Sequence, residues 1–292
     1  PLVYTIHATE YGRNNGIHNN IQRYINDVEW YACYEAWKLI VCSNYMKEEV
    51  KRLFQLPDDK ISVINNGVKV ENFETELQAG FRENYASPDE KIIFYVGRLV
   101  REKGVQYLLE AFSIALHERN NLKLVIAGKG PYEKQLRQKS YELNIDDRVY
   151  FTGFISDEER NMLYKAADLA VFPSLYEPFG IVALEAMASK IPLITTNAGG
   201  LDEFVIDGEN AFKVGTADPY QLAGAILRSF YDPERTSQMA KRAFQEVILE
   251  HNWDTIAEKT DFLYKKVLEE YDNSNWQNNF NWQQRIKKES IK

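Results

Sequence analysis

Continuous apolar runs alternate with segments of helical period along most of the chain, and this alternation limits the fold more than any other feature. The runs 91–97, 121–128, 167–174 and 191–197 lack the polar alternation of half-exposed strands, and amphipathic segments such as 105–118 lie between them. Strands that are apolar on both faces are typical of a parallel sheet covered by helices on both sides. The sequence therefore predicts an α/β fold with parallel sheets.

The alternation occurs in two blocks, which predict four segments along the chain. Residues 69–252 contain enough strands for a complete doubly wound domain, whereas 1–68 contain only two or three. Because so few strands leave a sheet edge unprotected, we expect 1–68 to be the C-terminal portion of a similar domain whose front part is absent. We expect 253–272 to form an amphipathic crossover helix that packs back on the first block, followed by a 273–292 tail.

Composition excludes several classes of protein. The 292 residues carry a formal net charge of −8, which argues against binding to nucleic acid. No apolar run reaches the ~18 residues that a transmembrane helix needs. The two cysteines, Cys33 and Cys42, have neither CxxC nor metal-site spacing, so we expect reduced thiols, no metal and a cytoplasmic protein.

Residues that suit a bound anion follow several of the predicted strands. Gly97-Arg98 and Lys103 follow one strand, Gly128–Pro131 follow the next, and Ser174–Gly180 lie between a later strand and its helix. The carboxyl ends of parallel strands form one rim, where ligands bind, and a diphosphate needs cations and free backbone N–H groups there. Considered one at a time, Arg98 and Lys103 could also be ordinary surface charges that bind no ligand. The GKGP segment is compatible with an ordinary turn, because it matches neither phosphate-binding motif.

The segment EPFGIVALE places two glutamates around a predicted helix start. Pro178 favours a helix that begins near Phe179 or Gly180, so that the amides of 179–182 are free to meet an anion. Gly180 is expected to let the ligand approach the backbone. Glu177 then lies at the helix mouth and Glu185 in the second turn, roughly 10 to 12 Å apart along the axis. Paired glycosidase carboxylates stand about 5 to 9.5 Å apart across one bond, so two separate hydrogen-bonding roles fit better.

The order of motifs resembles the family-4 retaining glycosyltransferases of the GT-B fold. The motifs are GRLVREKG, VIAGKGP, VYFTGFIS, EPFGIVALE and TNAGGLDEFVIDGENAF, and the resemblance extends from about residue 2 to 270. It implies two Rossmann-like domains with a cleft between them. It also implies transfer of a sugar from a nucleotide donor with retention of anomeric configuration, without a required metal or other cofactor.

The resemblance assigns roles to single positions on the donor side. Arg98 and Lys103, with the adjoining Gly97, match the residues that hold the donor diphosphate. Glu177 matches the glutamate that faces the donor sugar, and Glu185 the carboxylate that accepts from the ribose hydroxyls. The remaining matches are backbone positions: the amides of Phe179 and Gly180 at the sugar, those of Ile181 and Val182 at the phosphates, and Gly130 and Phe154 around the base.

Two residues of the first block match the opposite wall of the reaction centre. His7, in TIHATEYGR, matches a histidine that lines this centre, although a histidine at a strand end also suits a loop cap. Asn66 matches the asparagine at the interdomain hinge of glycogen synthase-like members. The other histidines are expected on the surface or in packing.

These features favour a glycogen synthase-like glucosyltransferase as the function. The donor is expected to be an ADP-, UDP- or GDP-linked sugar and the acceptor a glycan or another hydroxyl compound. Two alternatives stay open: a non-catalytic nucleotide-sugar-binding fragment or subunit of a split enzyme, and a sugar-nucleotide epimerase of the same fold. The spacing of Glu177 and Glu185 favours transfer over epimerisation.

Overall fold

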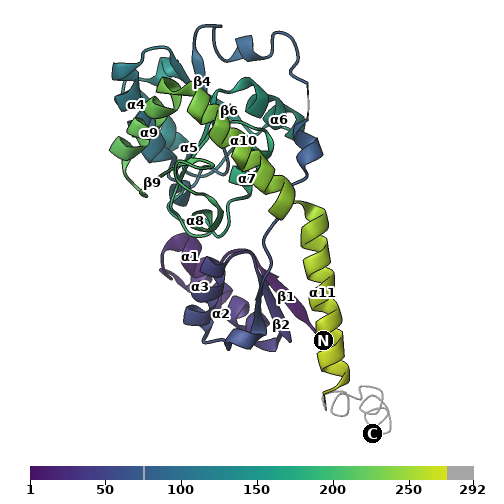
Figure 1. Cartoon of the computed structure of the whole chain (residues 1–292). Coiled ribbons are helices and arrows are strands. Elements are labelled where there is room, and N and C mark those ends of the chain that lie inside the picture. The colour runs from purple at the N-terminus through teal and green to yellow at the C-terminus, as the bar shows by residue number, and fades with distance from the viewer. Residues whose placement is uncertain (75, 275–292) are drawn as a thin grey trace.

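The computed structural model describes residues 1–74 and 76–274, which form two separate parallel β-sheets flanked by helices (Figure 1). The prediction of an α/β fold with parallel sheets is confirmed. The predicted tail, 273–292, lies outside the described residues except at 273 and 274. Among the described residues, no helix is long and apolar enough to cross a membrane.

The first sheet has three parallel strands in the order β1-β2-β3. Its strands are β1 (Val3–Ile6), β2 (Lys38–Val41) and β3 (Ile61–Val63). Its helices are α1 (Glu10–Asn14), α2 (Asn20–Glu35), α3 (Asn44–Phe54) and the 3-10 helix η1 (Asp58–Lys60). The sequence analysis missed α1, because five residues without a buried position carry no helical periodicity.

The second sheet has six parallel strands in the order β6-β5-β4-β7-β8-β9. The strands are β4 (Lys91–Val96), β5 (Leu122–Ala127), β6 (Val149–Gly153), β7 (Leu169–Phe172), β8 (Leu193–Thr196) and β9 (Phe212–Val214). The helices are α4 (Val105–Glu118), α5 (Glu133–Glu142), α6 (Asp157–Ala166), α7 (Ile181–Ala188), α8 (Leu201–Phe204), α9 (Pro219–Tyr231) and α10 (Pro233–Glu250). Short 3-10 turns complete it: η2 (Val70–Phe73), η3 (Arg82–Asn84), η4 (Arg101–Lys103) and η5 (Asp146–Arg148).

The strand order places a topological switch point between β4 and β7. From β4 the chain adds β5 and β6 on one side, then crosses to β7 and adds β8 and β9 on the other. Parallel sheets of this kind bind ligands in the crevice at the carboxyl ends of the strands where the order reverses. The loops after β4 and β7 carry Arg98 and Glu177, respectively.

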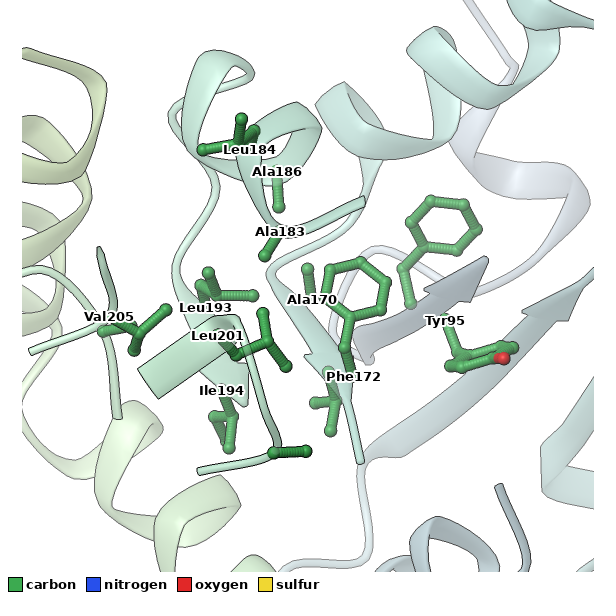
Figure 2. Close-up of a cluster of buried hydrophobic side chains, with 14 of the residues drawn as sticks. Tyr95, Ala170, Phe172, Ala183, Leu184, Ala186, Leu193, Ile194, Leu201 and Val205 are labelled. Carbon is green, nitrogen blue, oxygen red and sulfur yellow. The ribbon is translucent and has the colours of Figure 1, made fainter. Parts of the chain in front are cut away.

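A buried hydrophobic cluster fixes α7 beside this switch point. Figure 2 shows side chains of β7, β8, α7 and α8 gathered in this cluster, including Ala170, Ala183, Leu193 and Leu201. Alanines on both the strand and the helix allow the two backbones to approach closely. The N-terminus of α7 is therefore held in place by close-packed apolar contacts.

The last described helix, α11 (Trp253–Asp272), returns to the first sheet. Figure 1 shows it leaving the end of α10 and running alongside β1 and β2. A second hydrophobic cluster joins the two parts, with Ile256, Leu263 and Val267 of α11 packed on Ile40 and Ile64. The helix thereby connects the two sheets.

Candidate functional site

Hydrogen bonds join the loops that follow β4, β5 and β7 into one rim. The Gly97 amide donates to the carbonyl of Ala127 at 3.0 Å, and the Leu99 amide donates to that of Lys129 at 3.0 Å. The Leu175 amide donates to the Glu102 carbonyl at 2.8 Å. Segments that the sequence analysis grouped only by their position after strands are therefore in direct contact.

Gly104 sets the distance between the β4 loop and the β7 loop. It adopts a φ of +70°, and a Cβ there would lie 1.8 Å from the Pro173 carbonyl oxygen. Only glycine allows both this backbone conformation and this approach. As a result, Lys103 at the end of η4 is held against the loop that carries Glu177.

The helix start expected near Gly180 is present, with Gly180 as the N-cap of α7. The structure shows a further reason for this glycine, beside the expected approach of a ligand. Its φ is +111°, and a Cβ would lie 2.4 Å from a methyl carbon of Leu201, so backbone conformation and packing require glycine here. The first-turn amides of Ile181 and Val182 have no intrahelical acceptor and carry the positive end of the helix dipole.

A pocket of about 440 Å³ brings most of the predicted donor-side residues together. From the first sheet it receives His7, Cys42 and Asn66. From the second sheet it receives Lys103 and the residues 177–182, so the two sheets form opposite walls. His7 is exposed at the end of β1, as a residue that faces an open pocket should be.

Glu177 is the buried charged group of this pocket, and Lys103 neutralises it. The residue is only 7% exposed, and its Oε2 atom lies 2.6 Å from the Lys103 Nζ. Ser174 donates a second hydrogen bond to the same oxygen at 3.0 Å. A buried carboxylate requires such partners, because an unpaired charge away from water is strongly unfavourable.

Cys42 lines the pocket but is unsuited to nucleophilic chemistry. Burial raises the pKa of its thiol to about 12. Its sulfur lies 3.7 Å from the Pro178 carbonyl oxygen, to which the thiol donates a weak hydrogen bond. The thiolate, which is the reactive form, is therefore scarce near neutral pH.

Glu185 lies one helical turn further, outside the 440 Å³ pocket, and has its own partners. Arg160 of α6 lies 3.5 Å from one carboxylate oxygen, and the Tyr164 hydroxyl donates to the other at 3.2 Å. Burial raises the pKa of the Glu185 carboxyl above its ordinary value, and the Arg160 charge opposes this shift. The sequence analysis missed Arg160 and Tyr164, because nothing in α6 by itself indicates which residue faces α7.

Four other predicted residues, Gly97, Arg98, Gly130 and Phe154, also lie outside the lining of the 440 Å³ pocket. Arg98 is exposed and lines a different pocket of about 600 Å³, which also includes Pro131 and Tyr132 of the turn after β5. Gly130 lies under this turn, where a Cβ would come within 2.1 Å of the Leu99 carbonyl oxygen. Phe154 follows β6 and is 78% exposed.

The N-terminus of α3 makes contacts across the two sheets that the sequence analysis missed. The Ser43 hydroxyl donates to the Pro178 carbonyl at 2.5 Å, within the loop that positions Glu177. The Glu203 carboxylate of α8 accepts from the amides of Asn44 at 3.0 Å and Tyr45 at 2.6 Å. Figure 1 shows α3 and α8 facing each other where the two sheets meet. A serine that caps a helix was visible in the sequence, but its partner 135 residues away was not.

No metal site of protein side chains is evident in the part of the chain that the structure describes. Residues 1–74 and 76–274 contain no group of three His, Cys, Asp or Glu side chains placed to hold a metal ion. Lysine, arginine and backbone amides are groups of this rim that are suited to meet the charge of a bound anion.

Comparison with known proteins gives two family matches that together cover most of the chain. Residues 78–246 match the family described as "Glycosyl transferases group 1", and residues 1–72 match "Glycosyltransferase Family 4". An uncharacterized glycosyltransferase of Methanocaldococcus jannaschii is 38% identical over 274 residues, which cover 92% of this chain and 70% of the relative. The glycogen synthase of Mycobacterium tuberculosis is 35% identical over 265 residues, 90% of this chain; the match spans only 63% of the synthase.

Two solved structures have a similar fold. Sucrose-phosphate synthase from Thermosynechococcus elongatus has a TM-score of 0.79 at 30% identity, with 91% of this chain and 68% of that chain covered. Anabaena HepE, solved in complex with UDP and glucose, has a TM-score of 0.80 at 23% identity, with 91% and 71% covered. The arrangement of the two sheets is therefore shared with both structures.

Proposed function

Because this chain belongs to the group 1 glycosyltransferases and has the GT-B fold, we propose that it transfers a sugar from a nucleoside-diphosphate donor to a hydroxyl acceptor. We further propose that the sugar is glucose, that anomeric configuration is retained and that the protein acts in the cytoplasm. The observation that carries the proposal is the Lys103–Glu177 ion pair of 2.6 Å beside the N-terminus of α7, opposite His7. HepE, of the same fold, was solved with UDP and glucose, and the glycogen synthase relative supports glucose as the donor sugar.

The donor diphosphate is the group that develops negative charge as it leaves. The Lys103 ammonium, the first-turn amides of Ile181 and Val182, and the α7 dipole supply positive charge beside it. Arg98 lies on the same loop after β4 as Lys103 but lines a separate pocket, so its exposed side chain is proposed to swing toward the diphosphate when the donor binds. The positive charge of Lys103 and of the α7 amides is fixed before the reaction, and preorganised charge of this kind lowers the barrier most.

The donor sugar is proposed to lie between Glu177 and His7. Glu177 is oriented by Ser174 and Lys103, so its carboxylate is set to accept hydrogen bonds from sugar hydroxyls. Glu185 is proposed to accept from the ribose hydroxyls, one turn further along α7. The nucleotide-sugar would then extend along α7, with each carboxylate at a different part of the donor.

The test is donor binding and turnover. Isothermal titration with UDP, ADP and GDP should show one preferred nucleotide, and UDP-glucose, ADP-glucose or GDP-glucose should release that nucleotide when a hydroxyl acceptor is present. Product anomers measured by NMR should keep the α configuration of the donor. Binding without release under any acceptor would favour a non-catalytic nucleotide-sugar-binding role, and absence of any nucleotide binding would refute the proposal.

A further inference from the structure

A second pocket between the two sheets contains arginines that the proposed donor site does not use. Its volume is about 700 Å³. One wall comes from α1 and α3 of the first sheet, and the other comes from η4 and the segment 175–176. Figure 1 shows α1 and α3 on the side of the first sheet that faces the second.

Two guanidinium groups in this pocket form no ion pair among residues 1–74 and 76–274. They are Arg52 of α3 and Arg101 of η4, which lie on opposite walls and are both exposed. A third arginine, Arg13, is already bound to Glu10 at 3.2 Å and to Glu29 at 3.1 Å. Two unpaired guanidinium groups on facing walls of one pocket present planar sets of donors that suit an oxyanion.

The acidic residues that line the pocket leave both guanidinium groups unpaired. The Glu49 carboxylate is buried and accepts from the Thr9 hydroxyl at 2.6 Å and the Tyr176 hydroxyl at 2.9 Å, both at Oε1. Among the described residues, neither Glu49 nor Glu102 forms an ion pair with Arg52 or Arg101. Both guanidinium groups are therefore available to an anionic ligand.

Aromatic rings make the rest of the pocket suitable for a sugar ring. Tyr11, Tyr45 and Tyr176 line it, and the last two meet edge to face at 6.1 Å between ring centroids. The Arg52 guanidinium lies 5.9 Å from the centre of the Tyr11 ring, which holds the cation at the wall. Flat apolar faces with a few fixed polar groups are typical of sites for small organic ligands.

The pocket lies directly beside the proposed reaction centre. Glu102 and Tyr176 line it, and the residues that follow them in the chain are Lys103 and Glu177 of the donor site. It also shares Arg101 and three other residues with the 600 Å³ pocket that contains Arg98. A ligand in the 700 Å³ pocket would therefore lie next to both the 440 Å³ pocket of Lys103 and Glu177 and the 600 Å³ pocket of Arg98.

We propose that this pocket holds the acceptor, and that the acceptor is a sugar carrying a phosphate ester or a carboxylate bound by Arg52 and Arg101. The proposal rests on the proposed function. In the transfer, an acceptor hydroxyl oxygen bonds to the anomeric carbon of the donor while the bond from that carbon to the diphosphate breaks. The hydroxyl proton passes to the departing diphosphate, so no further reactant is needed.

The test compares four probes: glucose, glucose 6-phosphate, glucuronate and inorganic phosphate. Titration at low salt should show that glucose 6-phosphate or glucuronate binds at least about tenfold more tightly than glucose, because charge-assisted bonds to two arginines are lost with the neutral sugar. The double variant Arg52→Gln/Arg101→Gln should lose this advantage. The preferred probe of the two anionic sugars identifies the oxyanion as phosphate or carboxylate.

Matched measurements separate this proposal from the proposed function. Arg242→Gln, on α10, which contributes no residue to the pocket, is the control for a lost surface charge and should bind like the wild type. Nucleoside-diphosphate binding should be retained by the double variant, which also shows that it is folded. Suppose that the nucleotide binds but that glucose and both anionic sugars bind with equal affinity, or that the double variant keeps the preference for the anionic sugars. Either result would refute the acceptor proposal and leave the proposed function standing. Inorganic phosphate that binds as tightly as the anionic sugars would also overturn it, because the pocket would then recognise the anion without the sugar.

Discussion

Lys103 and Glu177 each depend on the other for both stability and chemistry. Their side chains are only 25% and 10% exposed, so removing either leaves a poorly solvated charge. The same lysine is the cation proposed to stand beside the departing diphosphate. Stability and turnover therefore have to be measured separately when this pair is changed.

We predict that Lys103→Ala lowers turnover of the nucleotide-sugar by roughly 10²- to 10³-fold, as loss of a preorganised charge does. It should also lower the free energy of unfolding by on the order of 2 kcal/mol, because Glu177 loses its counterion. Initial rates and denaturant melts check the two effects. Lys241→Ala removes an exposed lysine from α10, which contributes no residue to the 440 Å³ pocket, and should change neither quantity appreciably. Near-wild-type turnover of the Lys103 variant would contradict its assignment.

Glu185 should show opposite effects on stability and on binding. Its pKa is raised in the folded protein, mainly by burial, so the folded state holds the proton more tightly than the unfolded state. Its contribution to stability is therefore fully present below the ordinary pKa of a glutamate and is lost as pH rises through the folded-state value. At neutral pH the buried carboxylate is destabilising relative to a neutral group.

We predict that Glu185→Gln raises the thermal midpoint at pH 7 and that this gain shrinks as pH falls toward 4.5, the ordinary value from which the pKa is raised. If Glu185 accepts from the ribose, the same variant should bind nucleoside diphosphate roughly tenfold more weakly. Scanning calorimetry across pH and titration with nucleotide measure the two effects. A variant with unchanged nucleotide affinity would remove Glu185 from the proposed donor site.

At the scale of elements, a helix of one sheet is capped by a residue of the other. The first amides of α3 have no intrahelical acceptor, and the Glu203 carboxylate of α8 accepts from those of Asn44 and Tyr45. Ser43 joins the same helix start to the Pro178 carbonyl. These contacts hold the α3 N-terminus against the loop that orients Glu177.

We predict that Glu203→Ala lowers the free energy of unfolding by about 1 kcal/mol, the typical cost of a lost helix cap. Hydrogen exchange at the Asn44 and Tyr45 amides should become faster, because both lose their acceptor. Asp202→Ala is the matched control on α8: it removes only an exposed pairing with Lys213, so it should shift stability by less than ~0.5 kcal/mol. Equal effects of the two substitutions would argue against capping across the sheets.

At the scale of the whole molecule, the chain crosses between the two sheets at two adjacent places. The Val68 amide donates to the His251 carbonyl at 2.8 Å, and Val68 forms an isolated parallel bridge with Asn252. We propose that these crossings separate two domains, with boundaries after residues 68 and 252. The pocket between the sheets would then depend on contacts from α11 as well as on those at α3.

We predict that Leu263→Ala lowers the free energy of unfolding by about 2 to 4 kcal/mol, because it opens a cavity between α11 and the first sheet. Leu263 is 7% exposed and packs with Ile40 and Ile64, whereas Leu268 on the same helix is 53% exposed. Leu268→Ala should therefore cost less than ~0.5 kcal/mol. Chemical denaturation measures both variants, and a small effect at Leu263 would mean that α11 contributes little to holding the first sheet.

Local patterns were enough to predict much of the fold and the position of α7. Strands such as β4 and β7 are buried along most or all of their length, so their apolar runs are visible without any partner. Pro178 and Gly180 restrict the backbone locally, and this made the start of α7 predictable within a residue. Elements without periodicity, such as α1, α8 and the three-residue β9, were not predicted, because they are fixed by their neighbours.

The sequence by itself determined the parallel α/β architecture, the loops at the strand ends and the positions of Glu177 before α7 and Glu185 within it, because backbone preference and apolar periodicity act over a few residues. Only the tertiary structure decided which side chains meet. It brought Arg160 to Glu185 and Glu203 to the start of α3, placed Arg98 in a different pocket from Lys103, and set Arg52 opposite Arg101. Charge pairs and pockets form between segments far apart in the chain, where no local pattern records the partner.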